Sequence, residues 1–186
     1  MSPVRRCPRG STAIAAAALA IIAVLAAGAP AADTAPLGAF FGTFAGRTLM
    51  PMGEARNRDL QVAIRPYGAF GFSVEWRTTI DAFGNRPRER MQTLDFEPTR
   101  RPGIYTVARG DGGSADGPAE GEPYAWARLA GATLTVGVLT VDDRGDYVVQ
   151  SYDRTLTADG MALSFHRVRN GRIERQLRAT LKRIGD

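Results

Sequence analysis

The chain has 186 residues, which is the size of one ordinary domain. Hydrophobic residues make up 44% and charged residues 23%, a balance typical of a globular protein and not of a disordered chain. A single cysteine excludes an internal disulfide framework and a multi-cysteine zinc site, and a single histidine excludes every paired-histidine metal motif.

The first 32 residues have the three parts of a secretory signal peptide. The basic start, the apolar run and the Ala-x-Ala cleavage pattern lie in that order at residues 5–9, 13–27 and 29–31. We predict a signal helix in residues 1–32, cleaved after Ala31 or Ala32, and a periplasmic or secreted domain of residues 33–186. A retained membrane anchor is the alternative, but the apolar run is short for a span of about 20 residues. After cleavage no membrane span is expected.

Removal of the leader changes the charge balance. The leader holds three of the 24 basic residues, so residues 33–186 keep 21 basic against 19 acidic side chains, a net charge of +2. A nucleic-acid footprint needs a clustered basic face, and this balance predicts no nucleic-acid partner. The domain also lacks cysteine, which suits an oxidising exported compartment.

Residues 33–186 have the pattern of β-strands separated by turn residues. We predict strands at residues 40–49, 58–66, 70–80, 90–97, 104–109, 124–129, 133–141, 147–156, 161–169 and 173–184. In the clearest of them, one face carries Phe70, Phe72, Val74, Trp76 and Ile80, and this period of two indicates a half-buried strand. The turn Asn170-Gly171 is a strong hairpin signal. No helical pattern of comparable length follows the leader.

Regular short connections favour an all-β fold in which neighbouring strands pair in chain order. Closure removes the exposed edges of such a meander, so we predict an antiparallel up-and-down β-barrel of about 8–10 strands. Two open sheets packed as a sandwich are the alternative. An outer-membrane barrel would need an apolar band facing the lipid, whereas Ser73, Glu75 and Arg77 occupy the predicted outward face of residues 70–80.

Two stretches of the chain carry a family resemblance. Residues 37–44, LGAFFGTF, are similar to the Gly-x-aromatic entry strand of lipocalin-like barrels, with Phe where Trp is usual. The closing strands, from residues 133–136 through 152–154 and 161–165 to Leu181, resemble those of small exported lipocalin-like (calycin-type) β-barrel proteins of unknown function. The resemblance implies a barrel with a lumen and an apolar ligand, and it carries over no catalytic residue.

The residues offer little catalytic or metal chemistry. His166 is a conceivable haem ligand or base, but it alternates with Phe165 and should face outward. No G-x-S-x-G motif is present and residues 33–186 contain no cysteine nucleophile. The acidic groups at residues 111–122 and 142–146 lack the spacing of a calcium loop and suit solvated turns. The sequence therefore predicts no catalytic residue, no metal and no cofactor.

Aromatic and arginine side chains on predicted inward faces are the candidate ligand contacts. Strand parity places Arg128 with Trp126, Arg167 with Phe165, and Arg175 with Ile173 and Leu177. An inward guanidinium can bind a carboxylate through paired hydrogen bonds. The candidate ligand-binding residues are Trp76, Trp126, Phe165, Arg128 and Arg175. The alternative is that the tryptophans fill the core and the arginines reach water at the barrel mouth.

These patterns together favour an exported, non-enzymatic lipocalin-like protein that binds a small apolar or amphiphilic ligand in its lumen. A cell-envelope interaction protein with a filled core and no ligand is the alternative, and a hydrolase or isomerase inside the barrel is the third possibility. The lumen is predicted to be lined by one shared set of residues: Phe72, Val74, Trp76, Leu94, Phe96, Val136, Met161, Leu163, Phe165 and Leu181.

Overall fold

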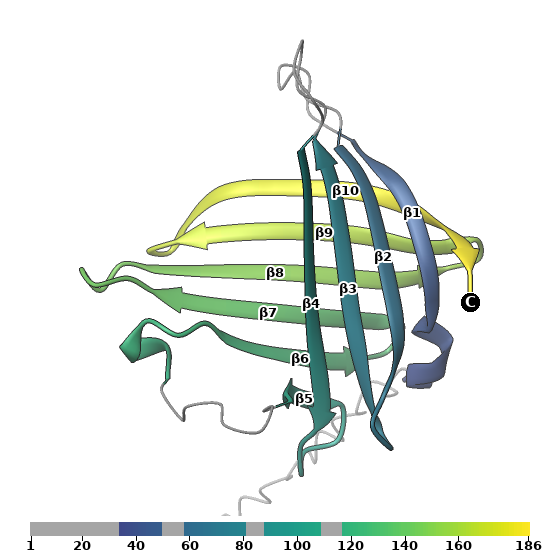
Figure 1. Ribbon diagram of the computed structural model, residues 1–186, viewed down its shortest axis with the longest axis horizontal. Coiled ribbons are helices and arrows are strands. Elements are labelled where there is room, and N and C mark those ends of the chain that lie inside the picture. Colours follow the sequence, from purple (N-terminus) through teal and green to yellow (C-terminus); the bar gives the residue numbers. More distant parts are fainter. Residues whose placement is uncertain (1–33, 50–57, 81–87, 109–116) are drawn as a thin grey trace, which may run out of the picture. The chain divides into compact units, whose positions relative to one another are not determined.

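The computed structural model describes residues 34–49, 58–80, 88–108 and 117–186 (Figure 1). All of them belong to one compact unit, Ala32–Asp186. The predicted signal helix lies outside the described residues.

Ten strands form a closed antiparallel barrel, and each strand pairs with its neighbours in the chain. The strands are β1 (Gly42–Leu49), β2 (Arg58–Tyr67), β3 (Gly71–Ile80), β4 (Arg88–Pro98), β5 (Ile104–Val107), β6 (Tyr124–Ala130), β7 (Thr133–Val141), β8 (Tyr147–Thr157), β9 (Gly160–Arg169) and β10 (Arg172–Gly185). Pairing of β1 with β10 completes the ring, so the predicted up-and-down barrel is confirmed and the open sandwich is excluded. In Figure 1 strands β1–β4 cross strands β6–β10 steeply. Two short 3-10 helices, η1 (Leu37–Phe40) and η2 (Pro118–Glu120), accompany the strands.

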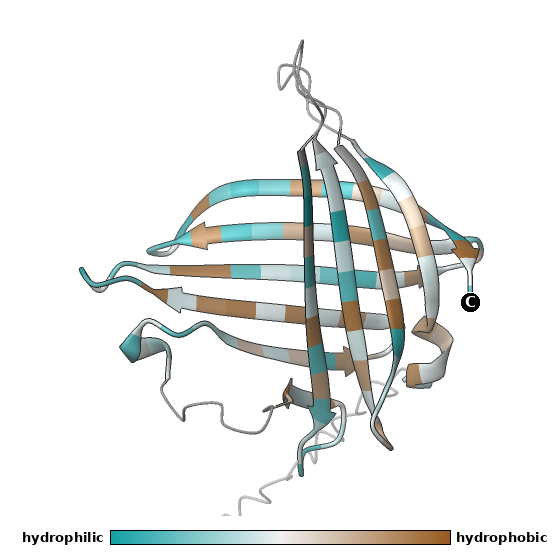
Figure 2. Cartoon of the chain, in the orientation of Figure 1, coloured by the Kyte–Doolittle hydropathy of each residue, from teal (hydrophilic) through white to brown (hydrophobic). Residues whose placement is uncertain are grey.

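Period-two alternation builds the barrel wall. Along β3, Phe72 and Val74 are fully buried, whereas Ser73 and Glu75, which alternate with them, are half-exposed. The same change from apolar to polar residues along most strands is visible in Figure 2. Because a shift by one residue would move every apolar side chain of a strand into water, this pattern fixes the register.

Two turns follow directly from their residues. Asn170 and Gly171 both have positive φ, at 48° and 78°, which the tight β9–β10 turn requires and which Asn and Gly tolerate. At the β7–β8 turn, the carboxylate of Asp142 accepts hydrogen bonds from the backbone N–H groups of Arg144 and Asp146, each at 3.0 Å. The predicted hairpin at Asn170-Gly171 is confirmed, and residues 142–146 form a turn as expected.

Two residues assigned to inward faces lie elsewhere. Phe70 belongs to the β2–β3 turn and is 79% exposed, because β3 begins only at Gly71. Ile173 is 63% exposed, because a bulge between Ile173 and Arg175 reverses the alternation at the start of β10. The bulge leaves Arg175 in phase with the inward residues Leu177 and Ala179.

One end of the barrel is closed by η1 and is called here the η1 end. Phe40 of η1 is fully buried in the core. Arg183 of β10 donates hydrogen bonds to the carbonyl oxygens of Ala39, at 3.0 Å, and Phe41. Its guanidinium also lies 4.6 Å from the ring centroid of the buried Phe44. These contacts hold η1 against the barrel.

Candidate ligand-binding site

The core fills the half of the barrel next to η1. Phe72 stacks on Phe96 with ring centroids 5.0 Å apart, and Tyr105 meets Phe72 edge-on at the same distance. Other fully buried members of this half include Phe40, Phe44, Ile64, Leu134, Met161 and Leu181. Every residue predicted to line the shared interior is buried or half-buried.

The other half of the barrel is hollow and contains two adjoining compartments. Both are lined by Trp76, Gln92, Gln150 and Tyr152. The indole N–H of Trp76 donates to the side-chain oxygen of Gln92 at 3.1 Å, and the Tyr152 hydroxyl donates to Gln150 at 3.2 Å. The rings of Trp76 and Tyr152 lie 5.6 Å apart. These four side chains therefore form a hydrogen-bonded partition between the compartments.

The apolar compartment has a volume of about 440 Å³. Besides the partition, its lining is Thr93, Leu94, Val107, Pro123, Ala125, Val138 and Thr140. It lies beside the shortest strand of the barrel. This strand, β5, has four residues and pairs with β4 only from Phe96 to Pro98. Among the described residues, β4 has no strand partner on this side over residues 88–94. An apolar group of a ligand thus has room here.

The arginine compartment has a volume of about 200 Å³. Besides the partition, its lining is Leu60, Thr78, Arg90, Phe165, Arg167, Arg175 and Leu177. Arg167 of β9 and Arg175 of β10 are direct cross-strand partners. No aspartate or glutamate lines this compartment among the described residues. It therefore has a strongly positive character.

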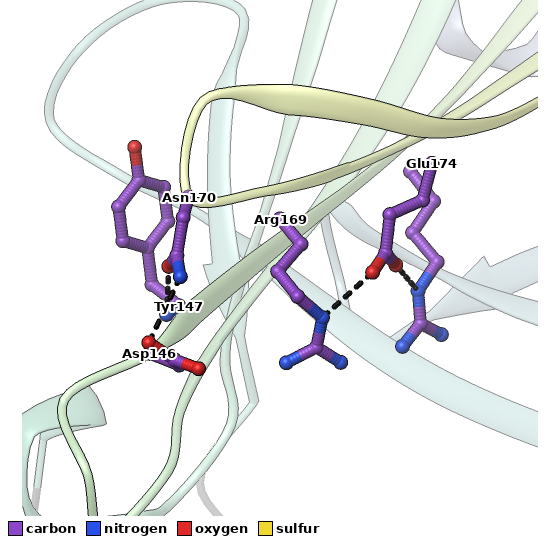
Figure 3. A network of polar contacts seen from close by, with 6 residues as sticks. Asp146, Tyr147, Arg169, Asn170 and Glu174 are labelled. Carbon is purple, nitrogen blue, oxygen red and sulfur yellow. Dashed lines mark hydrogen bonds and ion pairs between the residues drawn. The ribbon is translucent and has the colours of Figure 1, made fainter.

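Glu174 lies beside this compartment on the β10 bulge. Its two carboxylate oxygens accept hydrogen bonds from Arg167 at 2.8 Å and from Arg169 at 2.7 Å (Figure 3). These bonds lower the pKa of the Glu174 carboxyl. In the same view Asn170 joins the hairpins by hydrogen bonds to Asp146 and Tyr147. Glu174 therefore holds Arg167 while leaving the compartment itself without an acid.

The pKa of the Tyr152 hydroxyl is shifted by burial and by several charges around the hollow half. Burial raises the pKa of Tyr152, and the positive charges of Arg154, Arg167 and Arg90 partly oppose that rise. Arg154 lies one inward position deeper on β8 and is 1% exposed. Its guanidinium lies 5.5 Å from the Tyr152 ring centroid, and its Nε is buried without a hydrogen-bond partner. Burial lowers the pKa of Arg154 to about 10, so the group stays charged at neutral pH.

Three of the five predicted contact residues line the hollow half, and the other two lie on the outer face of the barrel. Trp76, Phe165 and Arg175 line the hollow half together. The prediction that Trp126 and Arg128 face inward is wrong, because the buried face of β6 consists of Ala125, Ala127 and Leu129. Trp126 instead lies over Gly137 on the outer surface, where a Cβ atom at Gly137 would come within 2.3 Å of the indole.

Arg154 and Tyr152 are the features that the sequence reasoning missed. The signal was present in the alternation Val148, Gln150, Tyr152, Arg154 and Leu156 on β8, whose members are all buried or half-buried. A charged residue in such a series suggests an outward position unless the alternation is traced along the whole strand. His166, on the opposite face of β9 from Phe165, lines neither compartment.

No group of three or more His, Cys, Asp or Glu side chains is placed to hold a metal ion in the described part of the chain. The helices of that part include none long and apolar enough to cross a membrane. Comparison of the chain with protein-family models, with curated proteins and with solved structures finds no significant match.

Proposed function

We propose that the protein is an exported lipocalin-like carrier that binds a small amphiphile with an acidic group. The apolar part of the ligand occupies the apolar compartment, and its acid group occupies the arginine compartment. The observation that carries the proposal is the adjacency of these two compartments across the partition formed by Trp76, Gln92, Gln150 and Tyr152.

The size and lining of the apolar compartment support a small ligand. Its volume of about 440 Å³ falls within the range of about 300–1,000 Å³ that is usual for ligand pockets. Leu94, Val107 and Val138 offer apolar surface, while the polar partition at its inner side supplies a few hydrogen-bonding groups. A filled interaction module would not need this space, which favours a ligand over the interaction-protein alternative.

The arrangement of charges supports an acidic group. Like charges directly opposite one another on neighbouring strands destabilise a sheet, and Arg167 and Arg175 are such a pair. Glu174 already compensates part of the charge of Arg167, and an anion between the two guanidiniums adds to that compensation and accepts charge-assisted hydrogen bonds. Arg90 lies across the same compartment on β4. A carboxylate, phosphate or sulfate group therefore fits this position better than a neutral group.

The positive charge of the buried Arg154 also favours an acidic group in the lumen. Burial disfavours the charged form of Arg154, the nearby Tyr152 and Asp153 offset this only in part, and an anion in the lumen offsets a further part. Its charge reaches the Tyr152 hydroxyl, where it favours negative charge. The Tyr152 hydroxyl is thus the expected hydrogen-bond donor to the bound acid.

Calorimetric titration with a medium-chain fatty acid and with the alcohol of the same length tests this proposal. We expect the acid to bind more tightly, and Arg175→Met to weaken the acid about tenfold or more while changing the alcohol little. Arg128→Met removes an arginine from the outer face and should change neither affinity. Equal weakening of acid and alcohol by Arg175→Met, or no binding of either, would contradict the proposal.

A further inference from the structure

The η1 end of the barrel carries an exposed aromatic ring. Phe70 lies at the tip of the β2–β3 turn and is 79% exposed, the most exposed large hydrophobic residue of the described chain. No ring contact or core position holds it among the described residues. A phenylalanine at a turn tip exposes apolar surface at a cost unless something covers it.

Two arginines lie on the neighbouring turn. The start of β3 lies beside the end of β4. Phe72 pairs with Phe96, and a Cβ atom at Gly71 would lie 2.1 Å from the Phe96 carbonyl oxygen. The β4–β5 turn that follows carries Arg100 and Arg101, both exposed. The two turns are therefore side by side at one end of the barrel.

The arginine turn is ordered. The Thr99 hydroxyl accepts the backbone N–H of Arg101 at 3.1 Å, and the N–H of Ile104 donates to the Arg101 carbonyl oxygen at 3.1 Å. A third bond runs from the N–H of Thr99 to the carbonyl oxygen of Ile104 at 2.9 Å. Little backbone entropy is therefore lost when this turn meets a partner.

The two adjoining turns are locally positive. Residues 66–70 and 98–103 contain two arginines and no acid, and Glu97 is the adjacent acidic residue on β4. Asp159 of the β8–β9 turn lies at the same end, beside Arg183. A partner of negative charge is thus attracted to the turns that carry Phe70, Arg100 and Arg101.

The chain also enters the barrel at this end. The backbone N–H of Ala35 donates to the carbonyl oxygen of Gly131 in the β6–β7 turn at 2.9 Å. Ala35 therefore lies at the same end as Phe70 and the two arginines. An aromatic tip flanked by arginines is the chemistry that binds the interface of an anionic bilayer.

We propose that the η1 end docks on an anionic lipid surface, with Phe70 entering the interface and Arg100 and Arg101 meeting the headgroups. Docking in this way leaves the hollow half of the barrel directed away from the lipid. The proposal is independent of any ligand in the lumen, and it goes beyond the proposed function.

Sedimentation with sucrose-loaded vesicles tests the proposal. Residues 33–186 contain every strand pair and the whole core, so this stretch is used. We expect it to bind vesicles of phosphatidylcholine with added phosphatidylglycerol, and to bind pure phosphatidylcholine at least tenfold more weakly. Each basic residue near an anionic surface contributes about fivefold, so Arg100→Ser/Arg101→Ser should lose about tenfold or more. Phe70→Ser should lose several-fold on the same vesicles.

The matched controls lie at the opposite end. Arg144→Ser/Arg172→Ser removes the same charge from exposed positions at or beside turns, and Ile173→Ser removes an apolar side chain that is 63% exposed. Both should bind as the parent does, and thermal unfolding of every variant checks that the fold is kept. Equal binding to both kinds of vesicle, no binding to either, or an equal loss in the opposite-end variants would overturn the proposal.

Discussion

The guanidinium of Arg154 lies 5.5 Å from the ring centroid of Tyr152, on the side away from the hollow half of the barrel. The two residues are consecutive on the inward face of β8. The buried charge of Arg154 therefore lies next to the partition between the two compartments. The lumen therefore has a positive potential that does not depend on the rim arginines alone.

We predict that Arg154→Met raises the pKa of the Tyr152 hydroxyl further above its usual value of 10. Burial raises this pKa already, and loss of the largest opposing positive charge leaves burial less compensated. Arg90→Met should cause a smaller rise in the same direction. Ultraviolet titration of the phenol measures both variants, and Arg128→Met on the outer face is the control. A Tyr152 pKa that falls in Arg154→Met would refute the electrostatic description.

The same substitution should not destabilise the ligand-free protein. The pKa of Arg154 is lowered to about 10, so burial disfavours its charged form and the charge opposes folding at neutral pH. Replacement by Met, which is shorter but likewise unbranched at Cβ, removes this cost, for an expected gain of about 1–3 kcal/mol in the free energy of unfolding. Urea denaturation at neutral pH checks this, and a clear loss of stability would mean that the guanidinium has partners that hold it.

Glu174→Gln should tighten the binding of an acidic amphiphile several-fold. Glu174 accepts a hydrogen bond from Arg167 at 2.8 Å and so competes with the ligand for that guanidinium. Because its pKa is lowered, Glu174 is ionised at neutral pH, where the competition is complete. Titration calorimetry with the acid and its alcohol gives the comparison. Glu89→Gln, which breaks the exposed ion pair with Arg77, is the control and should have no effect. Weaker binding of the acid in Glu174→Gln would show that Glu174 positions Arg167 for the ligand.

Gly137→Ala should cost about 1–3 kcal/mol of stability, since the added methyl group would meet the Trp126 indole. Gly117→Ala is the matched control, because its φ of −91° suits alanine and open space surrounds the position. Chemical denaturation measures both variants. In a Trp126→Ala background the cost of Gly137→Ala should largely disappear, and an unchanged cost there would refute the packing explanation.

The barrel and most of its lumen were predictable because alternation on β3, β9 and most of β10 separates large apolar from polar residues. On β6 the same reasoning failed, because the bulky Trp126 lies outside over Gly137 while small alanines face inward. Side-chain size is a poor guide where a glycine on the next strand makes room for a ring on the outer surface. The bulge beside Ile173 likewise reverses the alternation without any Gly or Pro to signal it.

The predicted export of the protein has its own test. N-terminal sequencing of the exported protein should find a start near Ala32 or Asp33, because the small residues at 29–31 fit the cleavage pattern. An intact Met1 on the exported protein would contradict cleavage and favour a retained anchor.

The central claim, an amphiphile bound in the lumen with its apolar part beside the partition, is tested most directly by fluorescence of the two single-tryptophan variants. Trp76 lines both compartments, whereas Trp126 lies on the outer surface. Trp126→Phe keeps only the lumenal reporter, and Trp76→Phe keeps only the outer one. We predict saturable quenching by a brominated fatty acid in Trp126→Phe and none in Trp76→Phe. Quenching of Trp126 with no change at Trp76 would place the ligand outside the barrel and contradict the account.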